Sequence, residues 1–174
     1  MTKKEFMKRI SKEKRDILQE FVALLRKKKI PFCVIGGLAV NAYTEPVVSL
    51  DLDLVVVADR LEETLQSLKK RVTTKKFPNS VNISCFNSDV RIQIQTDPRY
   101  QDFISRAAPG DILGYKLPVA KIEDVIQGKI WAAQDETRRP SKRQKDLADI
   151  LRLVEAKRAL VSLIPYSLRR KLSL

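Results

Sequence analysis

Two aspartates separated by one residue lie in an apolar segment and are the residues best suited to chemistry. Asp51 and Asp53 belong to the run LDLDLVVV over 50–57, whose alternating first half and β-branched second half predict a strand. Side chains alternate between the two faces of a strand, so both carboxylates point the same way, about 6.5–7 Å apart. They repel each other unless a cation lies between them. Mg²⁺ (or Mn²⁺) suits this place, because Mg²⁺ binds one or two carboxylates while substrate phosphates complete its coordination.

A glycine pair precedes these aspartates by fourteen residues and could bind the phosphates of the same substrate. Gly36 and Gly37 follow the apolar run 32–35 and precede a helical pattern over 38–43. Free N–H groups and the dipole at a helix start can receive a phosphate, and glycine lets its oxygens approach the backbone. A glycine pair alone is usually a tight turn, and an Asp-x-Asp alone is usually solvated. Together and in this order they favour a nucleotide–metal site.

The elements that position these residues can be read from the spacing of apolar side chains. Helical spacing predicts helices over 13–29, 38–43, 60–71, 99–107, 122–133 and 142–156. Apolar or alternating runs predict strands over 32–35, 50–57, 81–86, 90–96 and 111–113, and Asn87-Ser88-Asp89 forms the turn of a hairpin. Leu50, Leu52 and Leu54 should anchor their strand on the face opposite the aspartates. This order predicts an α+β fold, a mixed β-sheet flanked by helices with a helical C-terminal third.

The segment 34–57 resembles the signature of the polymerase-beta-like nucleotidyltransferase superfamily. Its members share Gly-Gly or Gly-Ser, a spacer, and Asp-x-Asp on the next strand. The resemblance implies that Asp51 and Asp53 bind the metal and act in catalysis, and that Gly36 and Gly37 hold the triphosphate. It also implies a nucleotidyltransferase core over 30–120. Charge and helical spacing predict a basic N-terminal helix over 1–29 before this core and a helical region over 121–174 after it.

The C-terminal half resembles the AbiEii-like toxin nucleotidyltransferases. The matching features are a Pro-Val segment, a lysine on a helix, an arginine-rich turn and a Lys-Asp-x-x-Asp run, which stand at Pro118-Val119, Lys129, Arg138 to Arg143, and Lys145-Asp146 with Asp149. The resemblance implies that Lys129 and Lys145 contact nucleotide phosphates, and that Asp146 orients Lys129 or serves in catalysis. The residues alone also allow a solvated lysine and an ion-pair network within one helix.

Two departures from the superfamily pattern affect the expected activity. Many members supply a third carboxylate from a neighbouring strand, and the corresponding residue of Val90-Arg91-Ile92-Gln93-Ile94 is Gln93. We expect Gln93 beside the two aspartates, where its amide oxygen could bind a metal but could not act as a base. The arginine that often precedes the Asp-x-Asp strand is also absent, since Pro46, Val47 and Val48 stand there.

Composition excludes several classes of site. The 174 residues contain no histidine, which excludes triads with a histidine base and makes a zinc site implausible. Cys33 and Cys85 lie in apolar runs, which is typical of reduced, cytoplasmic proteins. No apolar run approaches the roughly 20 residues of a membrane span, so no membrane partner is expected.

The net charge of +13 is concentrated at the two ends of the chain. Residues 1–29 carry +7 and residues 138–174 carry +8, whereas residues 30–137 carry −2. Basic surfaces of this kind attract nucleic acid, although they can also serve solubility alone. For a nucleic-acid substrate, the N-terminal helix and the 138–158 segment should converge on the rim of the aspartate cleft.

The leading hypothesis is a metal-dependent nucleotidyltransferase that transfers a nucleoside monophosphate from an NTP. The acceptor would be an RNA, for example a tRNA 3′ end, or a protein hydroxyl, and the partner protein would be an antitoxin or toxin. The alternative is a degenerate module that binds nucleotide or RNA without catalysis, as Gln93 suggests; a structural adaptor is a third reading. The enzyme hypothesis requires Asp51 and Asp53 to face a cleft whose opposite wall includes Lys129.

Overall fold

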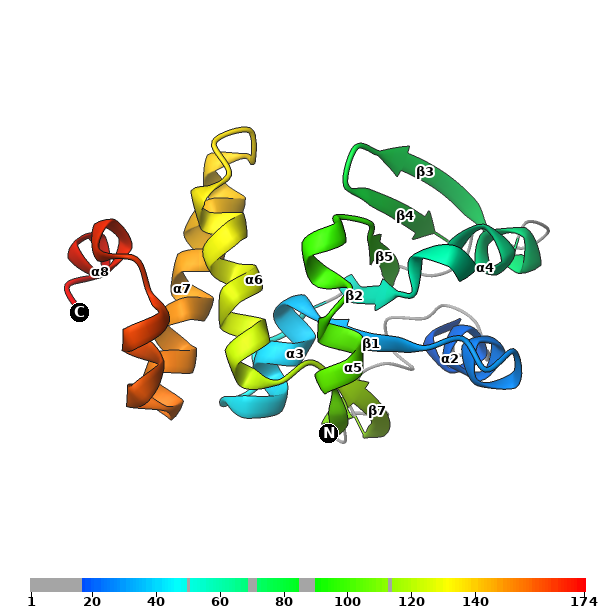
Figure 1. The fold of residues 1–174 in the computed structure, drawn as a ribbon, viewed down its shortest axis with the longest axis horizontal. Helices are drawn as coiled ribbons and strands as arrows, with labels where there is room; N and C mark the ends of the chain where they lie inside the picture. Colours follow the sequence, from blue (N-terminus) through cyan, green and yellow to red (C-terminus); the bar gives the residue numbers. More distant parts are fainter. Residues whose placement is uncertain (1–16, 50, 69–71, 85–89, 113) are drawn as a thin grey trace.

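The fold is built on one mixed sheet of seven strands in the order β3-β4-β5-β2-β1-β7-β6 (Figure 1). The computed structural model describes residues 17–49, 51–68, 72–84, 90–112 and 114–174. The strands are β1 (Phe32–Ile35), β2 (Asp51–Val56), β3 (Thr73–Phe77), β4 (Ser80–Ser84), β5 (Arg91–Gln95), β6 (Ala108–Ile112) and β7 (Tyr115–Val119). The pairs β2–β5 and β1–β7 are parallel, and the other neighbours are antiparallel.

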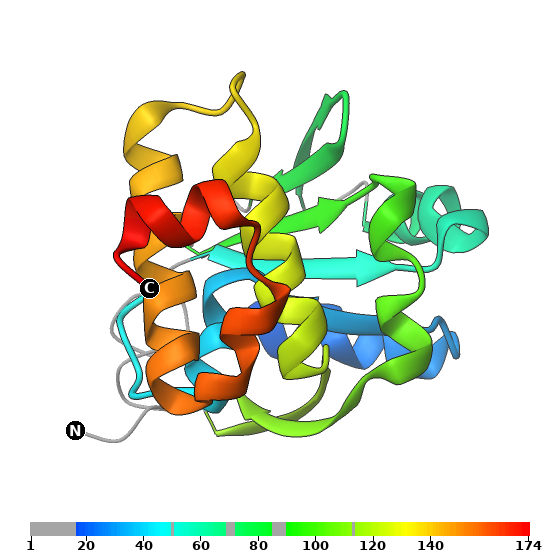
Figure 2. The same cartoon turned by 60° about the vertical axis from the view of Figure 1, so that its left-hand side comes forward.

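Helices cover both faces of this sheet. They are α2 (Ile17–Lys27), α3 (Gly36–Tyr43), α4 (Leu61–Leu68), α5 (Phe103–Arg106), α6 (Ile122–Gln134), α7 (Pro140–Ala156) and α8 (Tyr166–Leu172), with short 3₁₀ helices at Ala58–Arg60, Pro98–Tyr100 and Arg158–Leu163. Figure 2 shows α6 and α7 in front of the strands and α2 behind them. The α+β class, the flanked mixed sheet and the helical C-terminal third are therefore confirmed. None of the helices formed by these residues combines the length and apolar composition of a bilayer span.

The alternation in β2 separates a core face from a polar face, as predicted. Leu52 and Leu54 are 1% and 0% exposed, while Asp51 and Asp53 on the other face are only half-buried. The leucine face continues into Ile92 of β5, which lines a hollow shared with Phe21 of α2. The polar face of β2 is thus turned toward α3, α6 and α7. Leu50 lies outside the described residues.

Two strands, β3 and β7, were not expected from the sequence. β3 is an edge strand, and every one of its residues is exposed. Its sequence therefore has no apolar alternation from which a strand could be predicted. β7 contains Pro118, whose missing N–H argues against a strand, yet β7 pairs with both β1 and β6. The predicted 111–113 strand is the end of the longer β6, and the predicted 38–43 helix begins earlier, at Gly36. Residues 1–16, the 87–89 turn and Cys85 lie outside the described residues, whereas Cys33 is buried and unpaired.

Candidate active site

A polar pocket of about 160 Å³ lies between the polar face of β2 and the helices α6 and α7. All seven residues expected at the site line it: Gly36, Gly37, Asp51, Asp53, Lys129, Lys145 and Asp146. Lys129 stands on the wall opposite the aspartates, which is the arrangement that the enzyme hypothesis requires. The pocket therefore gathers residues from four separate elements, whose individual roles remain predictions.

The glycine pair begins α3 directly after the C-terminal end of β1. Gly36 has a φ of +67°, and a Cβ there would overlap the carboxylate of Asp53. A side chain is thus excluded both by conformation and by space. The residue at the helix start, Ile35, provides no side-chain cap, so the first N–H groups of α3 remain available to an anion.

Gly37 brings the backbone close to a cation from α7. The ammonium Nζ of Lys145 lies 4.0 Å from the point where a Cβ on Gly37 would stand, and Ser49 Oγ lies 3.4 Å from it. Lys145 is itself exposed. An anion placed against the Gly37 backbone would therefore also meet the charge of Lys145, which is the combination that a triphosphate needs.

Asp53 is the carboxylate most affected by its surroundings. Burial raises the pKa of Asp53 to about 6, and the neighbouring negative charge of Asp51 adds to the rise. The positive charges of Lys129, Arg138 and Lys145 oppose this rise. Gln93 of β5 lies directly beside Asp53 in the parallel register, which confirms the predicted place of Gln93. The position of a third carboxylate is thus filled by a neutral amide.

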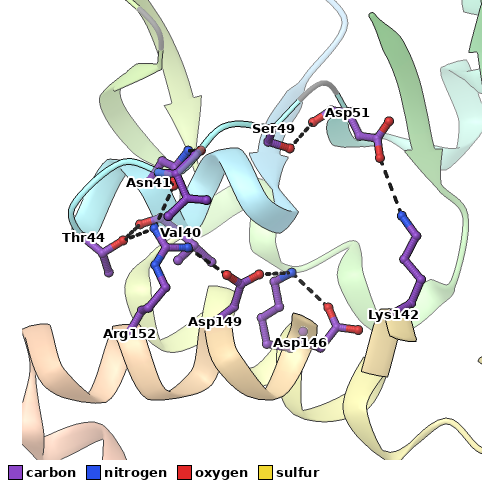
Figure 3. A network of polar contacts seen from close by, with 12 residues as sticks. Val40, Asn41, Thr44, Ser49, Asp51, Lys142, Asp146, Asp149 and Arg152 are labelled. Atoms are coloured by element: carbon purple, nitrogen blue, oxygen red, sulfur yellow. Dashed lines mark hydrogen bonds and ion pairs between the residues drawn. The ribbon is translucent and has the colours of Figure 1, made fainter. Parts of the chain in front are cut away.

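Asp51 is held by cations on two sides. Arg91 Nε lies 3.0 Å from one carboxylate oxygen. Lys142 Nζ lies 3.8 Å from the other oxygen (Figure 3). The pairing with Arg91 was missed by sequence reasoning. A signal for it existed, because Arg91 stands two residues before Gln93 and so shares its strand face.

Lys129 is buried in an ion pair with two aspartates of α7. Its Nζ lies 3.0 Å from Asp146 Oδ1 and 2.8 Å from Asp149 Oδ2, and Arg138 Nε lies 2.7 Å from the second oxygen of Asp146. Desolvation lowers the pKa of Lys129, but the attraction of Asp149 and Asp146 outweighs it and raises the pKa overall. The pairing of Lys129 is therefore between α6 and α7, while Asp149 also takes part in a pair within α7, of the kind that the residues alone allowed. Lys129 therefore lines the pocket as a positive charge that is held in place and balanced by two carboxylates.

Arg152 extends this network to the loop that leads into β2. Its guanidinium lies 2.8 Å from Asp149 and donates to Asn41 Oδ1 at 2.9 Å, Thr44 Oγ1 at 2.9 Å and the carbonyl of Glu45 at 2.7 Å (Figure 3). Asn41 also exchanges hydrogen bonds with the backbone of Val47. The 44–49 loop, which precedes Asp51, is thereby tied to α7. Sequence reasoning missed Arg152, for which the only signal was its i,i+3 spacing from Asp149.

Among the described residues, the basic rim of the pocket comes from the C-terminal part of the chain. Arg138, Lys142 and Lys145 line the pocket, as expected for the 138–158 segment. The described part of the N-terminal helix does not converge there, because Lys27 of α2 lines a separate hollow behind the sheet. That expectation is corrected for α2: its apolar stripe packs on the leucine face, which turns the helix away from the aspartates.

The donor set of the pocket fits one hard cation. No group of three or more histidine, cysteine, aspartate or glutamate side chains is placed to hold a metal in the described ranges. The pocket instead offers the carboxylates of Asp51 and Asp53 and the amide oxygen of Gln93. These are oxygen ligands of the kind Mg²⁺ accepts when a substrate phosphate supplies the others.

Comparisons with known proteins show the family and the fold of the chain. Residues 16–171 match the family described as nucleotidyl transferase AbiEii toxin, type IV TA system. No curated protein sequence matches the chain.

Among solved structures, the antibiotic-resistance factor ANT(2″)-Ia is 15% identical with a TM-score of 0.60, covering 90% of this chain and 91% of its own. The lincosamide antibiotic adenylyltransferase LnuA, bound to lincomycin, is 12% identical with a TM-score of 0.53, covering 78% and 95%. A putative nucleotidyltransferase from Thermotoga maritima is 16% identical with a TM-score of 0.56, covering 86% and 96%. At these identities the likeness establishes a shared fold.

Proposed function

Because the chain belongs to the AbiEii family of nucleotidyltransferase toxins, we propose that it transfers a nucleoside monophosphate from an NTP to a hydroxyl of an RNA acceptor, with Mg²⁺ or Mn²⁺ as cofactor. The observation that carries the proposal is the meeting of Asp51 and Asp53 with the Gly36-Gly37 turn and Lys145 in one pocket. Such a pocket combines a cation site with a phosphate site.

The chain's own residues suffice to orient a triphosphate. The uncapped N–H groups of α3 and the ammonium of Lys145 would bind the β- and γ-phosphates, because both present positive charge on the same side of the pocket. The α-phosphate then lies over β2. A divalent cation held by Asp51 and Asp53 would neutralise phosphate charge and so make the α-phosphorus more open to attack.

The transfer itself is a displacement at the α-phosphorus. The acceptor oxygen forms a bond to that phosphorus, the bond to the bridging oxygen breaks, and pyrophosphate leaves with the electron pair. Gln93 cannot take the proton, but its amide oxygen can accept a hydrogen bond from the attacking hydroxyl. The hydroxyl proton passes to water, since the pocket is open to solvent.

The choice of RNA as acceptor rests on the charge of the pocket rim. Arg138, Lys142 and Lys145 stand where an acceptor must pass, and a cationic approach lowers the repulsion between two anionic substrates. A protein hydroxyl gains less from such a rim. The family description also leads us to propose an antitoxin as the functional counterpart of this chain.

The test is transfer of label from each α-phosphate-labelled NTP to total tRNA, with Mg²⁺ or Mn²⁺. Asp53→Ala should abolish incorporation, whereas Asp59→Ala, which changes an exposed aspartate of the 58–60 turn, should leave it unchanged. Label appearing on a protein instead of RNA would identify the other acceptor class. NTP binding without transfer under either metal would identify the degenerate module that Gln93 suggests.

A further inference from the structure

A groove of about 970 Å³ continues the active-site pocket along the sheet. We name it the hairpin groove; it lies between the β3–β4 hairpin (Phe77–Ser80 and Asn82), β5 (Gln93 and Gln95) and the α6–α7 turn (134–139). Figure 1 shows the hairpin and this turn rising on its two sides. The pocket and the groove share six lining residues: Gln93, Gln95, Tyr100, Ala132, Arg138 and Lys142. A molecule in the groove therefore reaches the aspartates directly.

Two residues that line the groove, Gln93 and Asn82, belong to a row of side chains in register with Asp53, and the ends of that row lie beyond the groove. Asp53 pairs with Gln93, Gln93 with Asn82, and Asn82 with Lys75 across four neighbouring strands. Paired residues share a face of the sheet, so the row runs from the catalytic carboxylate to a lysine about 14 Å away, at roughly 4.8 Å per strand. Between the two charges lie neutral amides, which can donate and accept hydrogen bonds.

An exposed aromatic ring lies near the outer end of this row. Phe77 is 43% exposed, and the ammonium of Lys75 lies 5.1 Å from the centre of its ring. The neighbouring Lys76 points to the other face, where its Nζ lies 3.4 Å from Glu62 of α4. The ring and the cation of Lys75 thus form one exposed pair on the groove side of the sheet edge.

The opposite wall carries more basic than acidic side chains. It contains Arg138, Arg139 and Lys142, together with the single carboxylate of Asp135. Arg138 and Lys142 are each paired to an aspartate of the active site, but Arg139 is exposed and has no carboxylate within ion-pair distance among the described residues. This wall can bind the backbone phosphates of a strand whose bases lie toward the neutral amides of the row.

The geometry of displacement at phosphorus indicates that the acceptor, and not the NTP, binds in the groove. The nucleophile and the leaving group at a phosphorus lie roughly in line, on opposite sides. Pyrophosphate leaves toward Gly36-Gly37, on the β1 side of β2. The acceptor must then arrive from the β5 side, which is where the hairpin groove opens.

We propose that the hairpin groove binds the single-stranded 3′ end of the acceptor RNA, with its terminal hydroxyl at Gln93 and a base stacked on Phe77. This inference rests on the proposed function and adds the surface and the strandedness of the acceptor. An exposed ring beside a lysine, facing a cationic wall, is the combination that binds single strands, because bases stack on the ring while cations bind the backbone. A duplex would bury its bases and could not use Phe77.

The test measures binding of a fluorescein-labelled single-stranded RNA octamer with a free 3′ hydroxyl, in an Asp53→Ala background that cannot react. We expect Lys75→Glu with Phe77→Ala to weaken binding at least tenfold and to reduce the slope of log Kd against log salt. Lys76→Glu is the matched control, because it makes the same charge change on the same exposed strand but on the opposite face. Tyr166→Ala controls for the loss of an exposed aromatic ring elsewhere. Mg²⁺–NTP binding, measured on the Asp53-containing protein, should be unchanged in the double variant and in both controls.

A second measurement locates the strand directly. An octamer with 4-thiouridine near its 3′ end should crosslink to residues 73–84, identified by mass spectrometry, and a blunt duplex of the same sequence should compete poorly. Equal octamer binding by the double variant and Lys76→Glu, or crosslinks on α2 or α8, would overturn the groove assignment. Weakened NTP binding with intact RNA binding would also overturn it, by assigning the groove to the NTP base. Because these readouts require no turnover, they separate failure of the groove assignment from failure of the proposed transfer.

Discussion

The raised pKa of Asp53 makes a quantitative prediction about stability. In the unfolded chain an aspartate titrates near 3.8, whereas in the folded protein burial raises the pKa of Asp53 to about 6. The native state therefore holds more protons than the unfolded state between these two values. By linkage, stability falls as the pH rises through this window, and the ionised Asp53 costs stability at every pH above about 6.

The isosteric change Asp53→Asn should remove this cost and stabilise the metal-free protein at pH 8. A difference of roughly two pKa units corresponds to an upper limit of about 3 kcal/mol. For a chain of this size, that equals a rise in Tm of roughly 6–12 °C. The gain should shrink below pH 6 and vanish below about pH 4, where both states of the wild type are protonated. Urea unfolding followed by circular dichroism between pH 4 and 8, with a chelator present, measures it.

Asp51→Asn is the matched control, because it stands on the same strand face but is paired with Arg91 and Lys142. Its side chain is 26% exposed, so losing these pairs should change stability by no more than about 1 kcal/mol, and toward lower stability. The reasoning fails if Asp53→Asn leaves the pH 8 stability unchanged or lowers it. It also fails if the gain is as large at pH 4 as at pH 8.

Three further changes test the geometry of the site. Arg152→Lys keeps the positive charge, but a lysine cannot bind α7 and the 44–49 loop at the same time. The free energy of unfolding in urea should therefore fall by about 1–3 kcal/mol, and the KM for NTP should rise. Wild-type values would contradict the tie between the loop and the site. Arg91→Ala removes a cation that competes for Asp51, so calorimetry should find tighter Mn²⁺ binding in the presence of NTP; weaker binding would show that Arg91 helps instead. Gly36→Ala places a methyl group against the Asp53 carboxylate and strains a backbone of positive φ. This change should eliminate NTP binding in calorimetry and lower Tm. Retained NTP affinity would show that the glycine turn does not bind the phosphates.

The sequence determined the parts of the site that depend on local periodicity. Alternation along 50–57 is enough to put Asp51 and Asp53 on one face and Leu52 and Leu54 on the other, because successive side chains of any strand point to opposite faces. The place of Gln93 beside Asp53 was expected from the resemblance to the nucleotidyltransferase superfamily, and the parallel register of β2 and β5 confirms it. Local chemistry also marked the glycine turn at the start of α3, where φ is positive and a Cβ would overlap Asp53.

Only the tertiary structure decided how the charged residues are partnered. Lys129 meets Asp146 across 17 residues of sequence, and Arg152 meets Asn41 across 111, distances at which no local spacing carries information. The exposed strand β3 likewise has no apolar pattern and exists because β4 offers it backbone partners. Periodicity specifies on which face of its own helix or strand a side chain lies. The partner that it meets on that face depends on how the helices and strands pack. An ion pair between distant segments forms only when packing brings both charges together, and neither segment encodes that packing alone.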